Sequence, residues 1–399
     1  MRKSLVTRGR ARNMARMVSN SDLDLDFPAV SDLRRKARAR IPHFAFEYLD
    51  SGTGDELQVA RNRAALDAVQ FLPDILCGPM APDFTTSLLG REYGRPFGIA
   101  PVGMSGLMWP GAERILAAAA ARNRIPYGLS TVATKLPEEV GPVAGDMGWF
   151  QLYAPDDTEI LKDILERARA SGFTTLVLTV DVPDDSRRER QRRAKLSLPP
   201  KIDARMVWEI ATHPRWSLGT LREGRPRLKL AEGYLKDTGS RSSTAHAGHV
   251  IRGRPGWDYI ETLRGLWDGH LIIKGVMDPD HAVRLVGMGA DAIWVSNHSG
   301  RQFEGGPASI TQLPKVRAAL GPDTPIVFDS GVATGMDILR ARALGADFVM
   351  LGRAWHYAVA ALGAAGPDHL IHILTDDMKL NMAQIGAKDL SDLSRRLMR

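Results

Sequence analysis

The feature that most constrains this chain is a short apolar run that recurs eight times, each time with a helical pattern after it. The runs are rich in β-branched residues, and polar or glycine residues mark their ends, as expected of strands. They do not alternate apolar with polar residues, so both faces of each strand should be buried, as in a parallel sheet covered by helices. The eight runs span residues 97–101, 125–130, 149–153, 175–181, 271–275, 290–296, 325–330 and 348–352. Eight such units predict a closed (β/α)8 barrel.

Helical patterns lie between these runs and ahead of the first one. The strings GADAIWV and GADFVML each join a helix end to a strand, which repeats the same unit along the chain. One helix is expected over residues 31–48, before the barrel. The helices expected between the strands span residues 112–123, 156–171, 257–268, 279–288, 310–320 and 335–344.

The predicted fold is therefore α/β, a TIM barrel with an N-terminal helical segment and a long insertion after the fourth strand. We expect residues 26–399 to form this one domain and residues 1–25 to form a flexible basic tail. The insertion covers residues 184–256 and is rich in Arg, Gly, Ser and Pro. A connection of that length is typical of a lid or of a loop that docks on a membrane or a partner.

Positive charge concentrates in the tail and in the insertion. Residues 1–20 carry six basic and no acidic residues, and residues 184–256 carry 17 basic and 8 acidic residues. The formal net charge is +7, so the rest of the chain is acidic. Two basic segments on an acidic body indicate contact with an anionic surface, either lipid or a redox partner. A solvated tail and a solvated loop are the alternative.

Composition and motifs exclude several classes of protein. No apolar run approaches the roughly 20 residues that span a bilayer, and the N-terminus lacks the apolar core of a signal peptide, which favours a cytoplasmic location. The single cysteine, Cys77, excludes an internal disulfide framework and a cysteine-built metal site, and we expect no metal. Neither a dinucleotide-binding G-x-G-x-x-G nor a P-loop occurs in the right context.

Polar residues at the strand ends are the candidate site residues, because active sites of such barrels are assembled there. Taken singly, each of them is also explained as a helix cap or a turn residue. Their convergence at one end of a barrel favours a site. The candidates are Gln151, Tyr153, Thr179, Asp181, Lys274, Ser296, His298, Arg301, Asp329, Gly352 and Arg353.

The segment SNHSGRQ, residues 296–302, gives the strongest chemical signal. His298 is a proton acceptor, and Arg301 is a fixed cation that can hold a carboxylate through two parallel hydrogen bonds. Asp181 ends the fourth strand, where it can hold the imidazole in one tautomer. We predict His298 as the catalytic base. Arg188 is a weaker candidate for a second cation, because arginine runs are usually solvated.

Two further features indicate an electron-rich, phosphorylated ligand. Lys274 ends an apolar strand, so its charge should face an anionic or electron-rich group such as a reduced flavin ring. The segments DSGVATG and LGRA, near the last two strands, supply glycines whose backbone N–H groups can approach an anion. Arg353 would supply the countercharge of this phosphate site.

Together these motifs resemble the FMN-dependent 2-hydroxy acid dehydrogenase and oxidase family, which includes glycolate oxidase, L-lactate dehydrogenase and (S)-mandelate dehydrogenase. The likeness runs from about residue 31 to the C-terminus, weakens over residues 199–256, and is strongest to the mandelate and lactate dehydrogenase branch. The matching strings are FEYLDSG at 46–52, APVGM at 100–104, LST at 129–131, FQLY at 150–153, LTVD at 178–181, IKGV at 273–276, SNHSGRQ at 296–302, DSG at 329–331 and LGR at 351–353.

The resemblance implies a role for each matching residue. His298 would remove a proton from the substrate with Asp181 behind it, and Tyr153 would bond the hydroxyl oxygen. The substrate carboxylate would be bound by Arg301, Arg188 and Tyr48. FMN would be bound by Ala100, Pro101, Val102, Gly103, Ser130, Gln151, Thr179, Lys274, Ser296, Asp329, Gly331, Gly352 and Arg353.

The sequence also departs from the family pattern. Ala333 stands where the family commonly has an arginine that grips the phosphate, so Arg353 should carry more of that charge and FMN affinity should be reduced. Ser299 replaces the glycine after the catalytic histidine, a change that we expect to be tolerated. Val132 and Gly103 should enlarge the pocket, which favours lactate or mandelate over glycolate. The string HPRWSL, residues 213–218, resembles the insertion by which mandelate dehydrogenases sit on the membrane.

We therefore expect an FMN-dependent (S)-2-hydroxy acid dehydrogenase that passes electrons to a quinone or another acceptor. It should be a homo-oligomer, with tetramers frequent among relatives, in the cytoplasm or peripheral on the inner face of the cell membrane through residues 184–256. An oxygen-using oxidase or a lactate monooxygenase-like enzyme is the alternative. A non-enzymatic basic protein that holds membrane or nucleic acid is the second alternative; we expect no nucleic acid, since a scaffold needs no such set of site residues.

Overall fold

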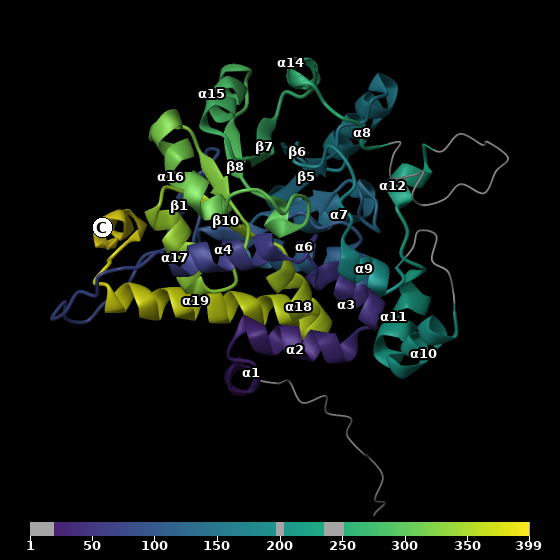
Figure 1. The fold of residues 1–399 in the computed structure, drawn as a ribbon, viewed down its shortest axis with the longest axis horizontal. Coiled ribbons are helices and arrows are strands. Elements are labelled where there is room, and N and C mark those ends of the chain that lie inside the picture. The colour runs from purple at the N-terminus through teal and green to yellow at the C-terminus, as the bar shows by residue number, and fades with distance from the viewer. Residues whose placement is uncertain (1–19, 197–202, 235–250, 399) are drawn as a thin grey trace, which may run out of the picture.

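The computed structural model describes residues 20–196, 203–234 and 251–398 (Figure 1). Eight parallel strands close into a barrel in the order β10-β3-β4-β5-β6-β7-β8-β9. Each predicted run overlaps one of these strands, so the predicted (β/α)8 barrel is confirmed. The strands are β3 (Phe97–Ile99), β4 (Tyr127–Ser130), β5 (Gly148–Leu152), β6 (Thr175–Thr179), β7 (His270–Val276), β8 (Ala292–Val295), β9 (Ile326–Phe328) and β10 (Phe348–Leu351).

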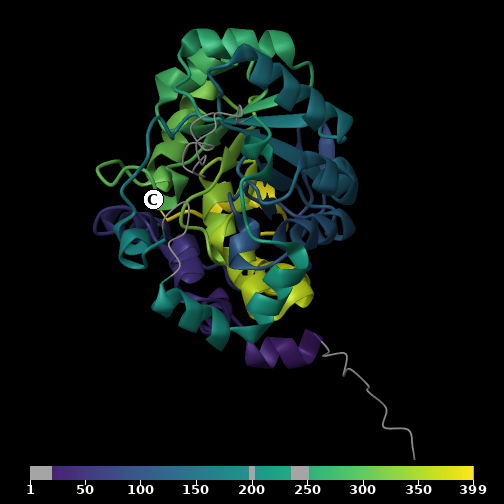
Figure 2. The same ribbon diagram turned by 90° about the vertical axis from the view of Figure 1, so that its right-hand side faces the viewer.

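A helix follows each barrel strand, and the ring of helices surrounds the sheet in Figures 1 and 2. The six helices predicted between strands are present, and the first of them has the predicted bounds. The sequence reasoning missed α7, which contains Pro142, and α18, which follows the last strand. The eight helices are α6 (Ala112–Asn123), α7 (Pro137–Ala144), α8 (Thr158–Ala170), α14 (Trp257–Leu266), α15 (Pro279–Gly287), α16 (Ser309–Leu320), α17 (Gly335–Ala343) and α18 (Arg353–Leu362); α19 (Gly366–Gln384) comes next.

The N-terminal segment is helical but contains a break that was not predicted. The single helix expected over residues 31–48 is wrong: α2 (Val30–Arg40) and α3 (His43–Asp50) are separated at Ile41 and Pro42. Proline restricts the residue before it to extended backbone, and Ile41 has φ −117° and ψ 151°. The break lets α2 pack against α18 while α3 places Tyr48 in the wall of a cavity.

The other N-terminal elements are α1 (Asn20–Asp26) and α4 (Leu57–Asp67). Helix α1 begins within the segment expected to be a tail and contacts α19. The rest of that segment, residues 1–19, lies outside the described residues.

Apolar side chains fill the barrel toward the N-terminal ends of its strands. Trp149 and Trp294 meet there edge to face, with ring centroids 6.4 Å apart. The two-stranded sheet of β1 (Thr86–Leu88) and β2 (Arg91–Tyr93) contributes Leu88 and Tyr93 to this cluster. A ligand therefore has to be held at the opposite end, where polar residues follow the strands.

The long insertion follows β6 and is helical in its described parts. Its helices are α9 (Glu189–Arg193), α10 (Ala204–Thr212), α11 (Pro214–Glu223) and α12 (Lys229–Glu232). Figure 1 shows the first three of them near α3. Trp216 anchors α11: its ring lies 5.8 Å from that of Phe44, and its Nε1 donates to the carbonyl oxygen of Leu107 at 2.9 Å. No described helix is both long and apolar enough to cross a membrane.

Candidate active site

A cavity of about 600 Å³ lies at the C-terminal ends of the barrel strands, and most of the predicted site residues line it. From the predicted set, the lining includes Tyr48, Ala100, Pro101, Val102, Gly103, Tyr153, Arg188, Lys274, His298, Arg301, Asp329, Gly331, Gly352 and Arg353. The other predicted residues are not part of the wall; they are Ser130, Gln151, Thr179, Asp181 and Ser296. Each of these five lies in a barrel strand or within two positions of its end.

His298 lies on the cavity wall and is paired with Asp181 behind it. The Nδ1 atom of His298 lies 3.0 Å from Oδ1 of Asp181, and both side chains are mostly buried. Burial lowers the pKa of His298 below its ordinary value, although the charge of Asp181 opposes the shift. Burial acts to raise the pKa of Asp181, but the charges of His298 and Lys274 outweigh it, and the pKa stays below its usual value. Asp181 is therefore ionised and accepts the Nδ1 proton of a neutral imidazole, whose Nε2 is left as a base.

Gly275 leaves room for Asp181 at an irregularity in β7. The register of β7 on β8 shifts between Lys274 and Val276, and Gly275 has φ +104°. A Cβ atom at Gly275 would lie 2.5 Å from Cβ of Asp181. Only glycine combines that backbone conformation with so close an approach.

Two arginines at the mouth have no carboxylate partner among the described residues. Arg301 donates to the carbonyl oxygens of Leu49 and Ser51 at 3.1 and 3.3 Å. Arg353 donates to the same two oxygens at 3.2 and 3.0 Å. Burial lowers the pKa of Arg301 well below its usual value, and the charges of Arg188 and Arg353 add to the shift. Buried cations that lack counterions are costly unless an anion binds beside them, so this region fits an anionic ligand.

Arg188 and Arg190, two residues apart, have opposite surroundings. Arg188 contacts neutral groups, with Nη2 donating to Oε1 of Gln302 at 3.0 Å. Arg190 forms ion pairs with Glu47 at 2.6 Å, Asp50 at 2.9 Å and Glu56 at 3.1 Å. Arg188 is thus available to a ligand carboxylate, whereas Arg190 ties α9 to α3. No local sequence pattern distinguishes the two arginines.

The residues beneath the cavity fit a flavin ring. The side-chain amide nitrogen of Gln151 is buried and has no partner among the described residues, while its Oε1 accepts from Ser130 at 2.7 Å. Lys274 Nζ donates to Ser296 Oγ at 2.9 Å and lies 3.5 Å from Asp329. Burial acts to lower the pKa of Lys274, but Asp329 and Asp181 raise it above its ordinary value, so the amine is charged. An unpartnered amide donor and a charged amine match the polar edge of a flavin.

At the end of the cavity that would hold the phosphate, the predicted residues supply backbone groups and a single cation. Gly331, Gly352 and Arg353 line the cavity there together with Ala333. Arg63, from α4, also lines it and was missed by the sequence reasoning, because a lone arginine on a helix is indistinguishable from a solvated one. Its guanidinium is already paired with Asp337, at 2.7 Å.

Ser299 occupies a backbone conformation that suits the glycine usual at this position. Its φ is +55°, in the left-handed region, and its N–H donates to Ser330 Oγ at 3.1 Å. A serine there is strained by about 1 kcal/mol relative to glycine. The substitution is accommodated, and it leaves the Ser299 carbonyl oxygen 3.3 Å from Arg353.

The sequence matches the FMN-dependent dehydrogenase family over residues 37–399. The chain belongs to this family. The resemblance found from the sequence is thereby confirmed, as are the FMN cofactor and the enzyme class, FMN-dependent 2-hydroxy acid dehydrogenase. Among the described residues there is no group of three or more histidine, cysteine and carboxylate side chains placed to hold a metal ion.

Several relatives of this FMN-dependent dehydrogenase are named. L-lactate dehydrogenases of Ectopseudomonas mendocina and Vibrio parahaemolyticus are each 37% identical, covering 93% and 92% of this chain and 98% and 97% of their own length. The crystal structure of the monotopic membrane protein (S)-mandelate dehydrogenase superposes with a TM-score of 0.87 at 33% identity, covering 94% of this chain and 99% of that one. A mandelate oxidase structure with (S)-2-phenylpropionate gives 0.77 at 28% identity, covering 93% and 98%.

Proposed function

We propose that this protein oxidises an (S)-2-hydroxy acid to the 2-keto acid, with His298 as the base. The observation that carries the proposal is the His298–Asp181 pair, 3.0 Å apart, in one cavity with Arg301 and Arg188, which lack carboxylate partners among the described residues. A neutral base beside uncompensated cations suits a substrate that has both an acidic proton to lose and a carboxylate to bind. Bound FMN supplies the two-electron acceptor.

In this proposal, the protein residues bind, orient and deprotonate the substrate. Arg301 and Arg188 bind the carboxylate, with Tyr48 beside Arg301, whose guanidinium lies 5.5 Å from the tyrosine ring. Burial raises the pKa of Tyr153, so its hydroxyl stays protonated and donates to the substrate oxygen. His298 Nε2 removes either the Cα proton or the hydroxyl proton, and Asp181 stabilises the resulting imidazolium.

FMN would be held by the residues carried over from the family. Backbone of residues 100–103 would support the ring, with Gln151 and Lys274 at its polar edge. Gly331, Gly352 and Arg353 would bind the phosphate, with Ala333 contributing no cation. The remaining contacts would come from Ser130, Thr179, Ser296 and Asp329.

A lactate- or mandelate-like acid fits the pocket wall best. A Cβ atom at Gly103 would lie 2.6 Å from Val132 Cγ2 and 3.5 Å from the Tyr48 hydroxyl, so glycine keeps this corner open. The relatives support both acids, since two are named L-lactate dehydrogenases and one structure is an (S)-mandelate dehydrogenase.

The test is an anaerobic absorbance spectrum of the purified holoprotein before and after addition of (S)-lactate, (S)-mandelate and their R enantiomers, each alone. We expect one or both S acids to bleach the flavin band and the R acids to leave it unchanged. A flavin that none of the four acids reduces would contradict the substrate class and the role of His298.

The acceptor is proposed to be a quinone or another electron carrier. The dehydrogenase names of the 37%-identical relatives favour this over oxygen, and the likeness to mandelate oxidase keeps the oxidase as the alternative. Products of lactate oxidation in air separate the cases. Pyruvate without peroxide supports a dehydrogenase, pyruvate with peroxide an oxidase, and acetate a monooxygenase-like enzyme.

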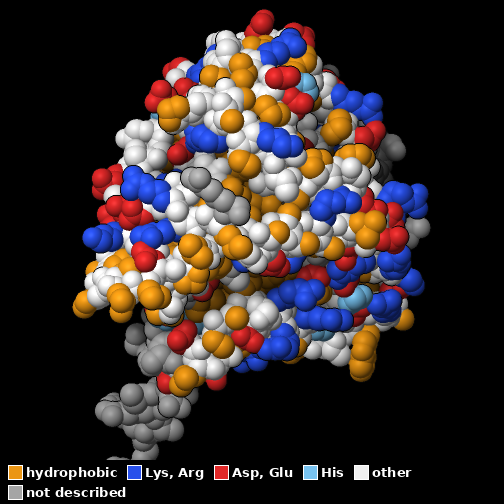
Figure 3. Space-filling view, turned by 60° about the vertical axis from the view of Figure 1, so that its left-hand side comes forward, with side chains coloured by type: hydrophobic (Ala, Val, Ile, Leu, Met, Phe, Trp, Pro, Cys, Tyr) orange, Lys and Arg blue, Asp and Glu red, His pale blue; other side chains and the backbone are white. Residues whose placement is uncertain are grey.

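We further propose that the insertion docks on the inner face of the cell membrane through α10 and α11. Trp208 and Leu221 are 69% and 80% exposed, and Val207 and Leu218 are more than half exposed. Arg205, Arg215 and Arg222 lie on the same two helices. Over the face drawn in Figure 3, basic and acidic side chains are interspersed. Apolar residues flanked by arginines suit an anionic lipid surface, and the similar (S)-mandelate dehydrogenase is described as monotopic.

Liposome sedimentation tests this docking with matched variants. Trp208→Glu combined with Leu221→Glu should abolish co-sedimentation with vesicles that contain anionic lipid. The control, Leu380→Glu, replaces a 58%-exposed leucine on α19 and should sediment like the parent protein. Equal sedimentation of all three proteins would remove the membrane proposal. The predicted homo-oligomer stays a prediction.

A further inference from the structure

A buried serine–histidine pair joins the two loops proposed to hold FMN, and it has no part in the chemistry above. Ser105 in α5 (Ser105–Met108) is 3% exposed, and His356 in α18 is 1% exposed. Nε2 of His356 lies 2.8 Å from Ser105 Oγ, and its Nδ1 lies 3.0 Å from the carbonyl oxygen of Gly352. Ser105 Oγ is also 2.9 Å from the carbonyl oxygen of Val102. The pair therefore links Ser105, two positions after the lining residue Gly103, to Gly352, which also lines the cavity.

The protonation of His356 fixes the direction of these bonds. A carbonyl oxygen only accepts, so Nδ1 carries the proton that is donated to Gly352. Burial lowers the pKa of His356 to about 4, and the charge of Arg301 acts in the same direction. The ring is therefore neutral near neutral pH and its Nε2 is an acceptor, so the single Ser105 hydroxyl proton is donated to Nε2 and not to the Val102 carbonyl oxygen.

A polar pair at this position has a specific consequence for the two loops. A leucine would fill the space of a buried histidine without needing partners, whereas a buried imidazole costs free energy unless both nitrogens are satisfied. Hydrogen bonds fix the separation and orientation of the groups that they join, which apolar packing does not. The loops also lie close together: a Cβ atom at Gly352 would be 3.4 Å from Val102 Cγ2. A small change in their separation would reshape the cavity between them.

We propose that Ser105 and His356 are positioning residues that hold residues 100–103 and 352–353 at the separation that binds FMN, and thereby set the affinity for the cofactor. The inference rests on the FMN placement proposed above. The pair joins Ser105, which follows residues 100–103 on the side of the ring, to the backbone of Gly352, the N-cap of α18, on the side of the phosphate. Loss of the pair should weaken FMN binding more than it changes the rate at which the holoprotein oxidises bound substrate.

The experiment measures FMN release from diluted holoprotein by the fluorescence of the free flavin. Ser105→Ala and His356→Leu should each raise the dissociation constant of FMN about 10-fold, consistent with loss of one buried hydrogen-bond link. Because both variants break the same link, the double variant should be no weaker than the worse single one. His356→Gln keeps a group that can accept from Ser105, so its effect should be smaller than that of His356→Leu.

A second buried histidine provides the matched control. His369 is 0% exposed, and its Nε2 lies 2.9 Å from the carbonyl oxygen of Phe27, which belongs to neither loop. His369→Leu should lower the melting temperature but leave FMN affinity within about 2-fold of the parent, by the additivity of distant sites. The proposal is overturned if His356→Leu behaves in the same way, or if the effects of Ser105→Ala and His356→Leu simply add.

One more variant separates this inference from the cofactor placement beneath it. Arg353→Met should raise the dissociation constant of FMN well beyond the effect of the pair, because it removes a cation from the proposed phosphate site. If Arg353→Met leaves FMN affinity unchanged, the placement is wrong. If Arg353→Met weakens binding and His356→Leu does not, the placement stands and the positioning role fails.

Discussion

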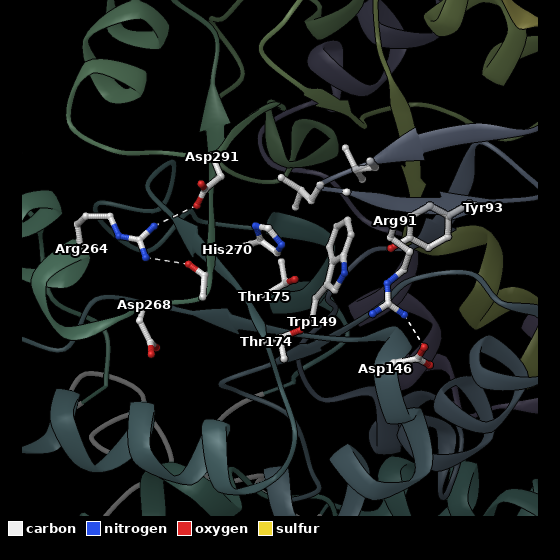
Figure 4. Close-up of a pocket in the computed structure, with 14 residues that line it drawn as sticks. Arg91, Tyr93, Asp146, Trp149, Thr174, Thr175, Arg264, Asp268, His270 and Asp291 are labelled. Carbon is white, nitrogen blue, oxygen red and sulfur yellow. Dashed lines mark hydrogen bonds and ion pairs between the residues drawn. The ribbon is translucent and has the colours of Figure 1, made fainter.

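The two ends of the barrel contain cavities of similar size, but the arginines that line them differ in their partners. The cavity at the N-terminal ends of the strands measures about 670 Å³ and that at the C-terminal ends about 600 Å³. Figure 4 shows the N-terminal one, where Arg264 is paired with Asp291 at 3.0 Å and Arg91 with Asp146. At the other end, neither Arg301 nor Arg353 has a carboxylate partner in the part of the chain that the structure describes.

Cavity volume alone therefore does not identify the ligand-binding site of this protein. Where each cation already has a carboxylate, the charges stabilise the fold and leave little to offer a ligand. Where cations are held by carbonyl oxygens alone, the fold has placed positive charge that an anion can satisfy. Four predictions test this contrast, from the largest expected effect to the smallest.

Removing the base should have the largest effect. His298→Gln keeps a polar side chain but cannot take a proton at neutral pH, so kcat should fall about 10³- to 10⁴-fold. Stopped-flow reduction of the flavin by the best S acid measures it, and the absorbance of the bound flavin serves as the folding control. Full turnover by the variant would show that the protein oxidises its substrate without His298 as the base.

Replacing a cation that has no carboxylate partner should decrease activity and increase the stability of the ligand-free protein. Arg301→Met should lower kcat/KM about 100-fold, because the substrate loses a charge-assisted partner. The same change should raise the free energy of unfolding of the ligand-free protein by about 1 kcal/mol, since it removes a buried charge without a counterion. Denaturant titration and steady-state kinetics report the two effects. A loss of both stability and activity would contradict the view that Arg301 is a buried cation without a counterion.

The pH dependence should place the base on the acid side of its ordinary range. A general base acts when neutral, so kcat/KM falls as pH drops through its pKa. Burial lowers the pKa of His298 below its ordinary value of 6.5, so the acid limb should lie below pH 6.5. Asp181→Asn removes the charge that opposes this shift and should move the limb to still lower pH while decreasing kcat. A limb that moves upward would mean that Asp181 does not stabilise the imidazolium.

The smallest effect should come from a paired cation at the N-terminal end. Arg264→Met breaks a partly exposed ion pair, so the free energy of unfolding should fall by about 1 kcal/mol or less. Neither kcat/KM nor FMN affinity should change, because the cavity in Figure 4 is at the far end of the barrel from the site. An altered KM in this variant would show that the ion pairs at the N-terminal end of the barrel affect the site at the other end.

Sequence reasoning worked where the signal is local. Strand β8 and the histidine after it are continuous in sequence, and barrel geometry brings the end of each strand to one face, so His298 and Asp181 were predicted to meet although they are 117 positions apart. The break at Pro42 was readable in principle, because a proline disfavours helical backbone in the residue before it.

Other features depend on contacts that no local pattern encodes. Ser105 and His356 are separated by 251 positions, and neither lies at a strand end. The ion pairs of Arg190 depend on where α3 lies, whereas Arg188, two residues earlier, contacts neutral groups. Helix α7 escaped prediction because Gly141 and Pro142 interrupt its pattern, although a proline there is tolerated when tertiary packing compensates.

The carbonyl oxygens of Leu49 and Ser51 join the two ends of the proposed ligand site. Each accepts from Arg301, proposed to bind the substrate, and from Arg353, proposed to bind the phosphate of the cofactor. When an anion draws one guanidinium away from these oxygens, the other guanidinium no longer competes for them. Such a shared anchor makes the two binding equilibria thermodynamically linked, and linkage is reciprocal. A non-reactive carboxylate analogue should therefore alter the affinity for FMN by the same factor by which FMN alters the affinity for the analogue.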